Sequence, residues 1–148
     1  MKKRVWLSLV FPACLLAACS ERIRQSKVPS VVQNSLMQAF KTANSIEWEK
    51  EKQNYEAEFV QDNTQYKAII NPTGSLLKYK QEINAMQLPA AVMQTLQAQY
   101  KEYVAEEVEK VGEGNQVYYQ VELENGLKEM HLVLTVDGAI NTNIRYWD

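Results

Sequence analysis

The sequence predicts an α+β fold in which two copies of a helix followed by a four-stranded antiparallel meander join into one sheet, with both helices on one face. Three observations support this fold class. One order of helix and strand signals occurs twice, period-two alternation marks the strands, and Asn-Gly, Asp-Gly and Asn-Pro-Thr-Gly turns separate them. With 148 residues, 46% of them hydrophobic and 23% charged, the chain has globular composition.

The first 18 residues have the organisation of an export signal. A basic start at residues 2–4 precedes an apolar run from Val5 to Leu16. At about 1.5 Å per residue this run is too short for the roughly 30 Å core of a bilayer. A buried N-terminal helix is the alternative interpretation. We expect residues 1–18 to be a signal peptide that is removed on export.

The end of this segment, Leu16-Ala17-Ala18-Cys19, resembles the lipobox of bacterial lipoproteins. The resemblance implies cleavage before Cys19 and attachment of a diacylglycerol to its sulfur, so that acyl chains hold the protein at a membrane. The predicted location is the bacterial cell envelope, with the outer membrane favoured and the domain in the periplasm or at the cell surface. Residues 19–27 are polar and are predicted to be a tether.

The chain that would remain after cleavage is acidic, with 13 basic and 18 acidic residues. This balance argues against binding to nucleic acid. Its only cysteine is Cys19, so no disulfide can form within it. Residues 28–148 must therefore be stabilised as a single domain by a hydrophobic core, for which their number is sufficient.

Two predicted repeats, residues 28–83 and residues 88–147, make up this domain. The start Val-Pro-Ser-Val-Val at 28–32 is echoed by Leu-Pro-Ala-Ala-Val at 88–92, and the offset grows from 60 to 64 residues further on. We expect an enlarged hairpin loop at residues 112–115 to absorb this difference. Joining the copies edge to edge would cover two sheet edges that separate units would expose.

Each repeat begins with a predicted helix and continues with predicted strands. Pro29 and Pro89 suit the first helical position, and apolar residues follow each at helical spacing. Alternating residues then predict antiparallel strands with one buried face. These strands start near Ile46, Tyr55 and Tyr66 in the first repeat and near Val117, Met130 and Ile140 in the second, where the last runs to Tyr146.

Each repeat resembles the PepSY module. The resemblance rests on the helix, on Tyr55-Glu56-Ala57-Glu58-Phe59 and its counterpart Tyr119-Gln120-Val121-Glu122-Leu123, and on the turn at residues 71–74. The tandem form is similar to a PepSY-like, beta-lactamase-inhibitor-protein-like family of exported Bacteroidetes proteins, over Val28 to Trp147. The resemblance implies the duplicated fold, export, and regulatory or inhibitory protein binding without enzymatic activity.

No catalytic residue, cofactor or metal site is predicted. The sequence has no Gly-x-Ser-x-Gly, P-loop or dinucleotide motif. Its single histidine, His131, has no partner placed by sequence spacing, and we expect it to face solvent. Glu47, Glu49 and Glu51 share one strand face at about 6.8 Å spacing, too far apart to share one cation. We therefore predict that the protein is not an enzyme.

The polar face of the sheet, opposite the helices, is the predicted binding surface. The candidate contact residues on it are Glu58, Ile69, Tyr118, Glu122, His131 and Val133. An ordinary solvated sheet face is the plainer interpretation.

The predicted function is that of a membrane-anchored extracytoplasmic lipoprotein. It would bind and regulate, or inhibit, an envelope protein such as a peptidase or a sensor. The alternative is a carrier or sensor that holds a small molecule between the helices and the sheet.

Overall fold

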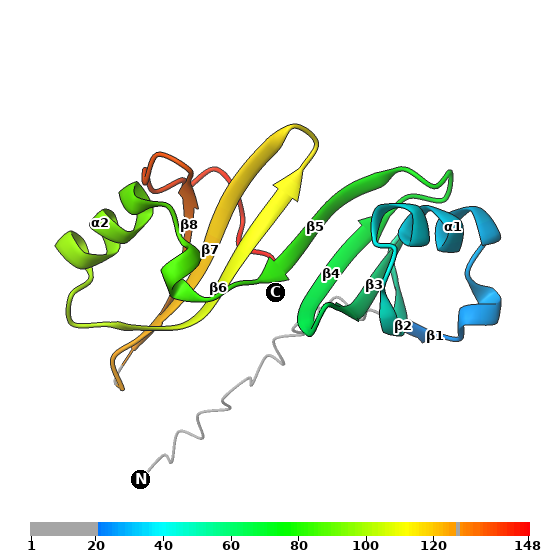
Figure 1. Cartoon of the computed structure of the whole chain (residues 1–148), viewed down its shortest axis with the longest axis horizontal. Helices are drawn as coiled ribbons and strands as arrows, with labels where there is room; N and C mark the ends of the chain where they lie inside the picture. Colours follow the sequence, from blue (N-terminus) through cyan, green and yellow to red (C-terminus); the bar gives the residue numbers. More distant parts are fainter. Residues whose placement is uncertain (1–20, 127) are drawn as a thin grey trace, which may run out of the picture.

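The computed structural model describes residues 21–126 and 128–148. Two helices lie over one face of an eight-stranded antiparallel sheet, and the strands are neighbours in chain order from β1 to β8 (Figure 1). The predicted α+β class, with two repeats in one sheet, is confirmed. The helices are α1 (Ser30–Ala39) and α2 (Ala90–Gln99). The strands are β1 (Glu21–Ile23), β2 (Asn44–Glu51), β3 (Asn54–Gln61), β4 (Thr64–Ile70), β5 (Leu76–Glu82), β6 (Val104–Glu113), β7 (Gln116–Glu124) and β8 (Glu129–Thr135).

Both helices begin directly after a proline, one residue later than the sequence predicts. Pro29 and Pro89 are the N-caps, and the backbone N–H groups of Phe40 and Tyr100 donate to the carbonyls of Leu36 and Leu96 at the ends. Each helix directs its apolar stripe at the sheet, which buries Val32, Leu36, Val92 and Leu96. The short amphipathic helices are therefore held by packing on the sheet.

The strand register repeats between the two copies. Lys50 pairs with Tyr55 in the first repeat as Lys110 pairs with Tyr119 in the second. The expected loop at residues 112–115 is wrong, because Glu113 pairs directly with Gln116. The four extra residues form two further cross-strand pairs, which lengthen the β6–β7 hairpin beyond its counterpart β2–β3.

The longer hairpin is where the two repeats meet, because β5 pairs with the extended part of β6. Tyr79 of β5 lies opposite Gly112 of β6. A Cβ at Gly112 would stand 2.5 Å from Cε1 of the Tyr79 ring, so a side chain there would have to displace the ring. Gly112 is thus a packing glycine and not a loop residue.

Residues 21–27 also belong to the fold, so the prediction of a tether over residues 19–27 is wrong for these seven residues. β1 pairs with β2 along the outer edge of the sheet. The Arg22 guanidinium there lies 2.9 Å from a Glu47 carboxylate oxygen. β1 covers an edge that β2 would otherwise leave open.

The expected fourth strand of the second repeat is wrong. It is reduced to a single bridge between Leu134 and Ile140, and residues 141–148, which we call the C-terminal segment, cross the helix-free face of the sheet. Figure 1 shows the C-terminal end beside β5, in the middle of the sheet. The physical reason is burial: Trp147 joins an apolar cluster on that face, which a strand at the sheet edge could not reach.

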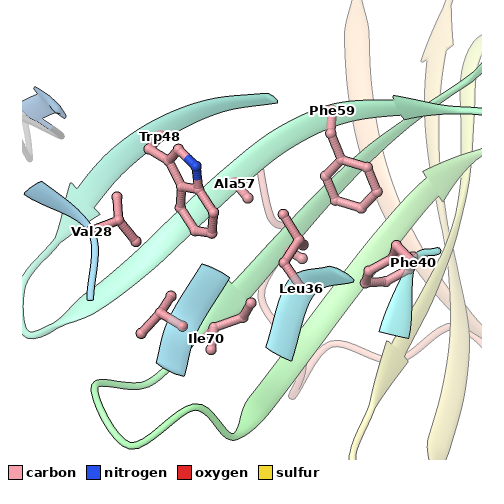
Figure 2. Close-up of a cluster of buried hydrophobic side chains, with 9 residues drawn as sticks. Val28, Leu36, Phe40, Trp48, Ala57, Phe59 and Ile70 are labelled. Atoms are coloured by element: carbon pink, nitrogen blue, oxygen red, sulfur yellow. The ribbon is translucent and has the colours of Figure 1, made fainter. Parts of the chain in front are cut away.

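The first repeat has an aromatic core under α1 (Figure 2). The Phe40 ring centroid lies 4.8 Å from that of Phe59, 5.6 Å from that of Tyr66 and 5.7 Å from that of Tyr79. Trp48 is buried in the same cluster. Such ring pairs add to the stabilisation from burial alone.

The second repeat has a mostly aliphatic core under α2, as the repeat offsets show. Leu123 and Met130 stand where the first repeat has Phe59 and Tyr66, and Val108 stands in place of Trp48. Leu36, Phe40, Phe59, Leu96 and Leu132 are buried in these two cores, whereas Tyr100 is partly buried.

Neither helix of the described residues has the length and apolar character needed to cross a membrane. The predicted signal peptide and the predicted lipid attachment site at Cys19 lie outside the described residues.

Candidate binding surface on the helix-free face

The C-terminal segment lies on an apolar patch at the centre of the helix-free face. Ile69 of β4, Val111 of β6, Tyr118 of β7 and Val133 of β8 form this patch, and Trp147 packs on it. Val111 and Tyr118 occupy the positions of Glu51 and Asn54 in the first repeat. The second repeat therefore has an apolar patch on its helix-free face as well, and the segment covers this patch.

Three of the predicted contact residues are not exposed, because the C-terminal segment covers them. Tyr118, Ile69 and Val133 retain only 2%, 4% and 5% of their accessible surface. The sequence places them on the predicted face, but the C-terminal segment buries them. They can touch a partner only if that segment moves.

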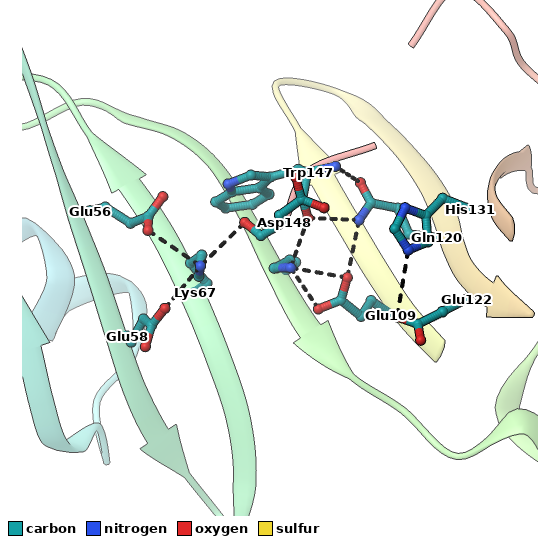
Figure 3. Close-up of polar contacts among 10 residues, drawn as sticks. Glu56, Glu58, Lys67, Glu109, Gln120, Glu122, His131, Trp147 and Asp148 are labelled. Atoms are coloured by element: carbon teal, nitrogen blue, oxygen red, sulfur yellow. Dashed lines mark hydrogen bonds and ion pairs between the residues drawn. The ribbon is translucent and has the colours of Figure 1, made fainter. Parts of the chain in front are cut away.

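Gln120 holds the backbone of Trp147 from both sides (Figure 3). Its Nε2 donates to the Trp147 carbonyl at 3.0 Å, and its Oε1 accepts from the Trp147 backbone N–H at 2.9 Å. Gln120 is fully buried. A glutamine on the sheet face thus donates to the carbonyl and accepts from the N–H of one residue.

Lys80 and Glu109 form a buried ion pair beside this anchor. Lys80 Nζ lies 2.9 Å from one Glu109 oxygen and donates to the Trp147 carbonyl at 2.8 Å. The other Glu109 oxygen accepts from Gln120 Nε2 at 3.0 Å. Burial raises the pKa of the Glu109 carboxyl, while the Lys80 ammonium acts in the opposite direction.

Lys67 holds the end of the segment from the first repeat. Its Nζ donates to the Asp148 backbone oxygen at 3.2 Å and lies 2.9 Å from Glu58 and 3.4 Å from Glu56. Glu56 is buried, whereas Glu58 is half exposed. Burial raises the pKa of Glu56, although Lys67 lowers it. The expected contact residue Glu58 is thus accessible at the rim of the segment.

His131 contacts the segment on its other side, and its expected exposure to solvent is wrong in part. Its ring stacks on Tyr146, with centroids 4.2 Å apart and planes 14° from parallel. Nε2 lies 3.1 Å from Glu129 and 3.6 Å from Glu122. One potential metal-ligating atom from each of Glu122, Glu129 and His131 lies within 4.8 Å of those of the other two. Glu129 lies two residues before His131 on the same strand and therefore shares its face, whereas only the fold brings Tyr146 to this place.

A pocket of about 450 Å³ opens between Tyr146, Asp148 and the strands. Its acidic lining residues are Glu58, Glu82, Glu107, Glu109, Glu122, Glu129 and Asp148. Lys67 and Lys80 also line it, but each is already paired with a carboxylate. The free charge of the pocket is therefore negative, which favours a cationic group of a ligand or partner.

A second, apolar cavity of about 340 Å³ lies beside the C-terminal half of α2. Leu88, Met93, Leu96, Tyr100, Tyr103 and Leu123 supply most of its apolar lining. In the first repeat Phe59 stands at the position of Leu123 and packs on Phe40 and Tyr66. The smaller side chain leaves space that the first repeat fills.

The sequence matches a family described as beta-lactamase-inhibitor-like and PepSY-like, over residues 17–78 and again over residues 74–142. The chain therefore belongs to this family. No curated protein matches it.

Solved structures share the fold. One is a protein from Bacteroides eggerthii DSM 20697 whose description assigns it to the periplasm, with 22% identity over 76% of this chain and 85% of the other and a TM-score of 0.71. Another is a BLIP-like protein from Bacteroides fragilis NCTC 9343, with 22% identity over 80% and 92% and a TM-score of 0.68. A DUF2874 family protein from Bacteroides uniformis ATCC 8492 has 20% identity over 76% and 85% and a TM-score of 0.70.

Proposed function

We propose that this chain is an extracytoplasmic, non-enzymatic module that binds an envelope protein through its helix-free sheet face. One observation carries the proposal: this face already holds a peptide, its own C-terminal segment, by a buried glutamine, a buried lysine and an apolar patch. The inhibitor-like description of the family and the periplasmic description of a solved relative support the same class of function.

The rim of the segment sets the chemistry of the partner. Glu58, Glu122 and Glu129 surround the segment with accessible carboxylates. We expect the partner to present basic residues there, which would speed encounter and fix orientation. A peptidase or a sensor of the envelope is the class of partner that we favour.

Cross-linking in intact cells tests this surface. A photoreactive residue at Glu129 should yield a covalent adduct, and the same residue at Met37, exposed on α1, is the matched control. Glu58→Lys combined with Glu122→Lys should abolish the adduct. An adduct that persists in this variant, or that forms equally from position 37, would refute binding through the helix-free face.

The membrane anchor is part of the same proposal and rests on Leu16-Ala17-Ala18-Cys19. Labelled palmitate should enter the wild type and not the Cys19→Ala variant. Equal labelling of the two chains would refute lipid attachment at Cys19. Separation of inner and outer membranes then tells which one holds the labelled protein.

The apolar cavity beside α2 supports a second candidate function, that of a carrier for a small apolar molecule. N-phenyl-1-naphthylamine, which fluoresces in apolar surroundings, is a suitable probe. The carrier function predicts saturable fluorescence with the wild type and none with Leu123→Phe, in which the added ring fills the cavity. Equal signals from both proteins would exclude this cavity as the binding site.

A further inference from the structure

We propose that the C-terminal segment is a built-in competitor, and that a partner inserts a segment with two adjacent aromatic residues in its place. This inference rests on the proposed function and names the partner's binding element. The chemistry of that element comes from Tyr146 and Trp147, the two aromatic residues that the face now holds.

The face recognises three features of the bound segment. Gln120 pairs with the backbone N–H and carbonyl of one residue, so this contact is open to any residue type except proline. The Trp147 ring lies on the apolar patch with Lys78 Nζ 4.1 Å from its centroid, which favours an aromatic side chain. Lys67 takes the oxygen of the following residue.

The segment can leave without breaking the sheet. The Asn141 N–H donates to the Val133 carbonyl as part of the bridge at Ile140 and can stay in place. Beyond it the segment does not continue as a strand, and side chains of Gln120, Lys80 and Lys67 supply the hydrogen bonds to Trp147 and Asp148. A segment with the same backbone contacts could form these bonds again. Exchange of the chain's own segment for the partner's therefore restores the same hydrogen bonds and leaves the pairing of the strands intact.

One defect shows that the chain's own segment is not an optimal ligand. Among the described residues, the buried Tyr146 hydroxyl has no hydrogen-bond partner. A buried, unpaired hydroxyl weakens binding relative to a residue that lacks it. Phenylalanine at this position would keep the stack on His131 without a buried, unpaired hydroxyl. A partner segment with phenylalanine here would therefore bind more tightly than the chain's own segment.

Peptide binding to the full chain tests the inference. The probe is a fluorescein-labelled peptide with the sequence of residues 141–148, followed by fluorescence anisotropy. We expect it to bind the Trp147→Ala protein at least about tenfold more tightly than the wild type, because the internal competitor is weakened. The peptide with phenylalanine in place of tyrosine should bind several-fold more tightly still, and the peptide with alanine in place of tryptophan should not bind.

Two outcomes would overturn the inference: no binding to a folded Trp147→Ala protein, or equal binding to variant and wild type. If circular dichroism shows that Trp147→Ala does not fold, Tyr146→Ala serves instead, since it leaves Trp147 and the four residues of the apolar patch unchanged. Peptide binding without a cross-linked partner would refute only the proposed function. A partner captured from position 129 without peptide binding would refute only this inference.

Discussion

The two repeats share a scaffold but differ in what they bury. The first packs Phe40, Phe59, Tyr66 and Tyr79 under α1 and keeps charged residues on its other face. The second has leucine and methionine under α2, an apolar cavity beside them, and an apolar patch on its other face.

The difference shows how a duplicated fold divides its tasks. A tightly packed first repeat stabilises the shared sheet, while the second has surplus apolar surface that needs a cover. The C-terminal segment supplies this cover and is anchored by both repeats, through Lys67 and Lys80 on one side and Gln120 on the other.

The largest expected effect comes from the aromatic core. Phe59→Ala should lower the free energy of unfolding by about 3–5 kcal/mol, whereas Leu123→Ala at the matching position should cost about 2–3 kcal/mol. Both residues are buried, but a cavity already borders Leu123. Urea unfolding of both variants measures the difference. Equal losses would show that the two cores are equally well packed.

The next effect comes from the lysines that hold the segment. Lys80→Ala should cost about 3 kcal/mol because it leaves Glu109 buried without a counter-ion. Lys67→Ala should cost about 1 kcal/mol, since Glu58 remains in contact with water. Urea unfolding at neutral pH gives both values. If Lys67→Ala lowered the free energy of unfolding more than Lys80→Ala does, the view that Lys80 and Glu109 form the more deeply buried pair would be wrong.

A smaller effect of opposite sign is expected from filling the cavity. Leu123→Phe should raise the free energy of unfolding by about 0.5–1 kcal/mol, because it restores the ring that the first repeat has. Thermal unfolding should show a higher midpoint. A lower midpoint would mean that the space is too small for the ring and that the core is overpacked.

The smallest effect is a pH dependence at Glu109. Burial raises its folded-state pKa, with Lys80 opposing, so its contribution to stability is complete below its ordinary value of 4.5 and is lost as pH rises through the raised value. The stability advantage of the wild type over Glu109→Gln should therefore grow as pH falls from 7 towards 4.5. Urea titrations at several pH values measure it. A difference that shrinks with falling pH would contradict the direction of this shift.

Local patterns predict the parts of the fold that local physics decides. The strand alternation and the prolines before each helix identify the sheet, both helices and buried residues such as Leu36 and Phe59. The register between copies also follows, since Glu122 pairs with His131 as Glu58 pairs with Lys67.

The sequence could not predict features decided by competition in three dimensions. Residues 140–146 alternate as a strand does, but burying Trp147 over Val111 and Tyr118 outweighs further pairing with β8. Gly112 lies in a glycine-rich stretch that is typical of a turn, but it is a strand residue whose missing side chain leaves room for the Tyr79 ring. The stack of His131 on Tyr146 depends on this crossing, so no spacing rule could show it.

Hydrogen exchange at the Trp147 backbone amide tests the central claim most directly, because this amide donates to Gln120 only while the segment is in place. The displaceable segment predicts measurable protection, with an opening free energy well below that of the Val121 amide in the middle of β7. Protection equal to that of Val121 would contradict the account, because the segment would then open only with global unfolding. Absence of protection would contradict it equally, because the segment would not then occupy the face.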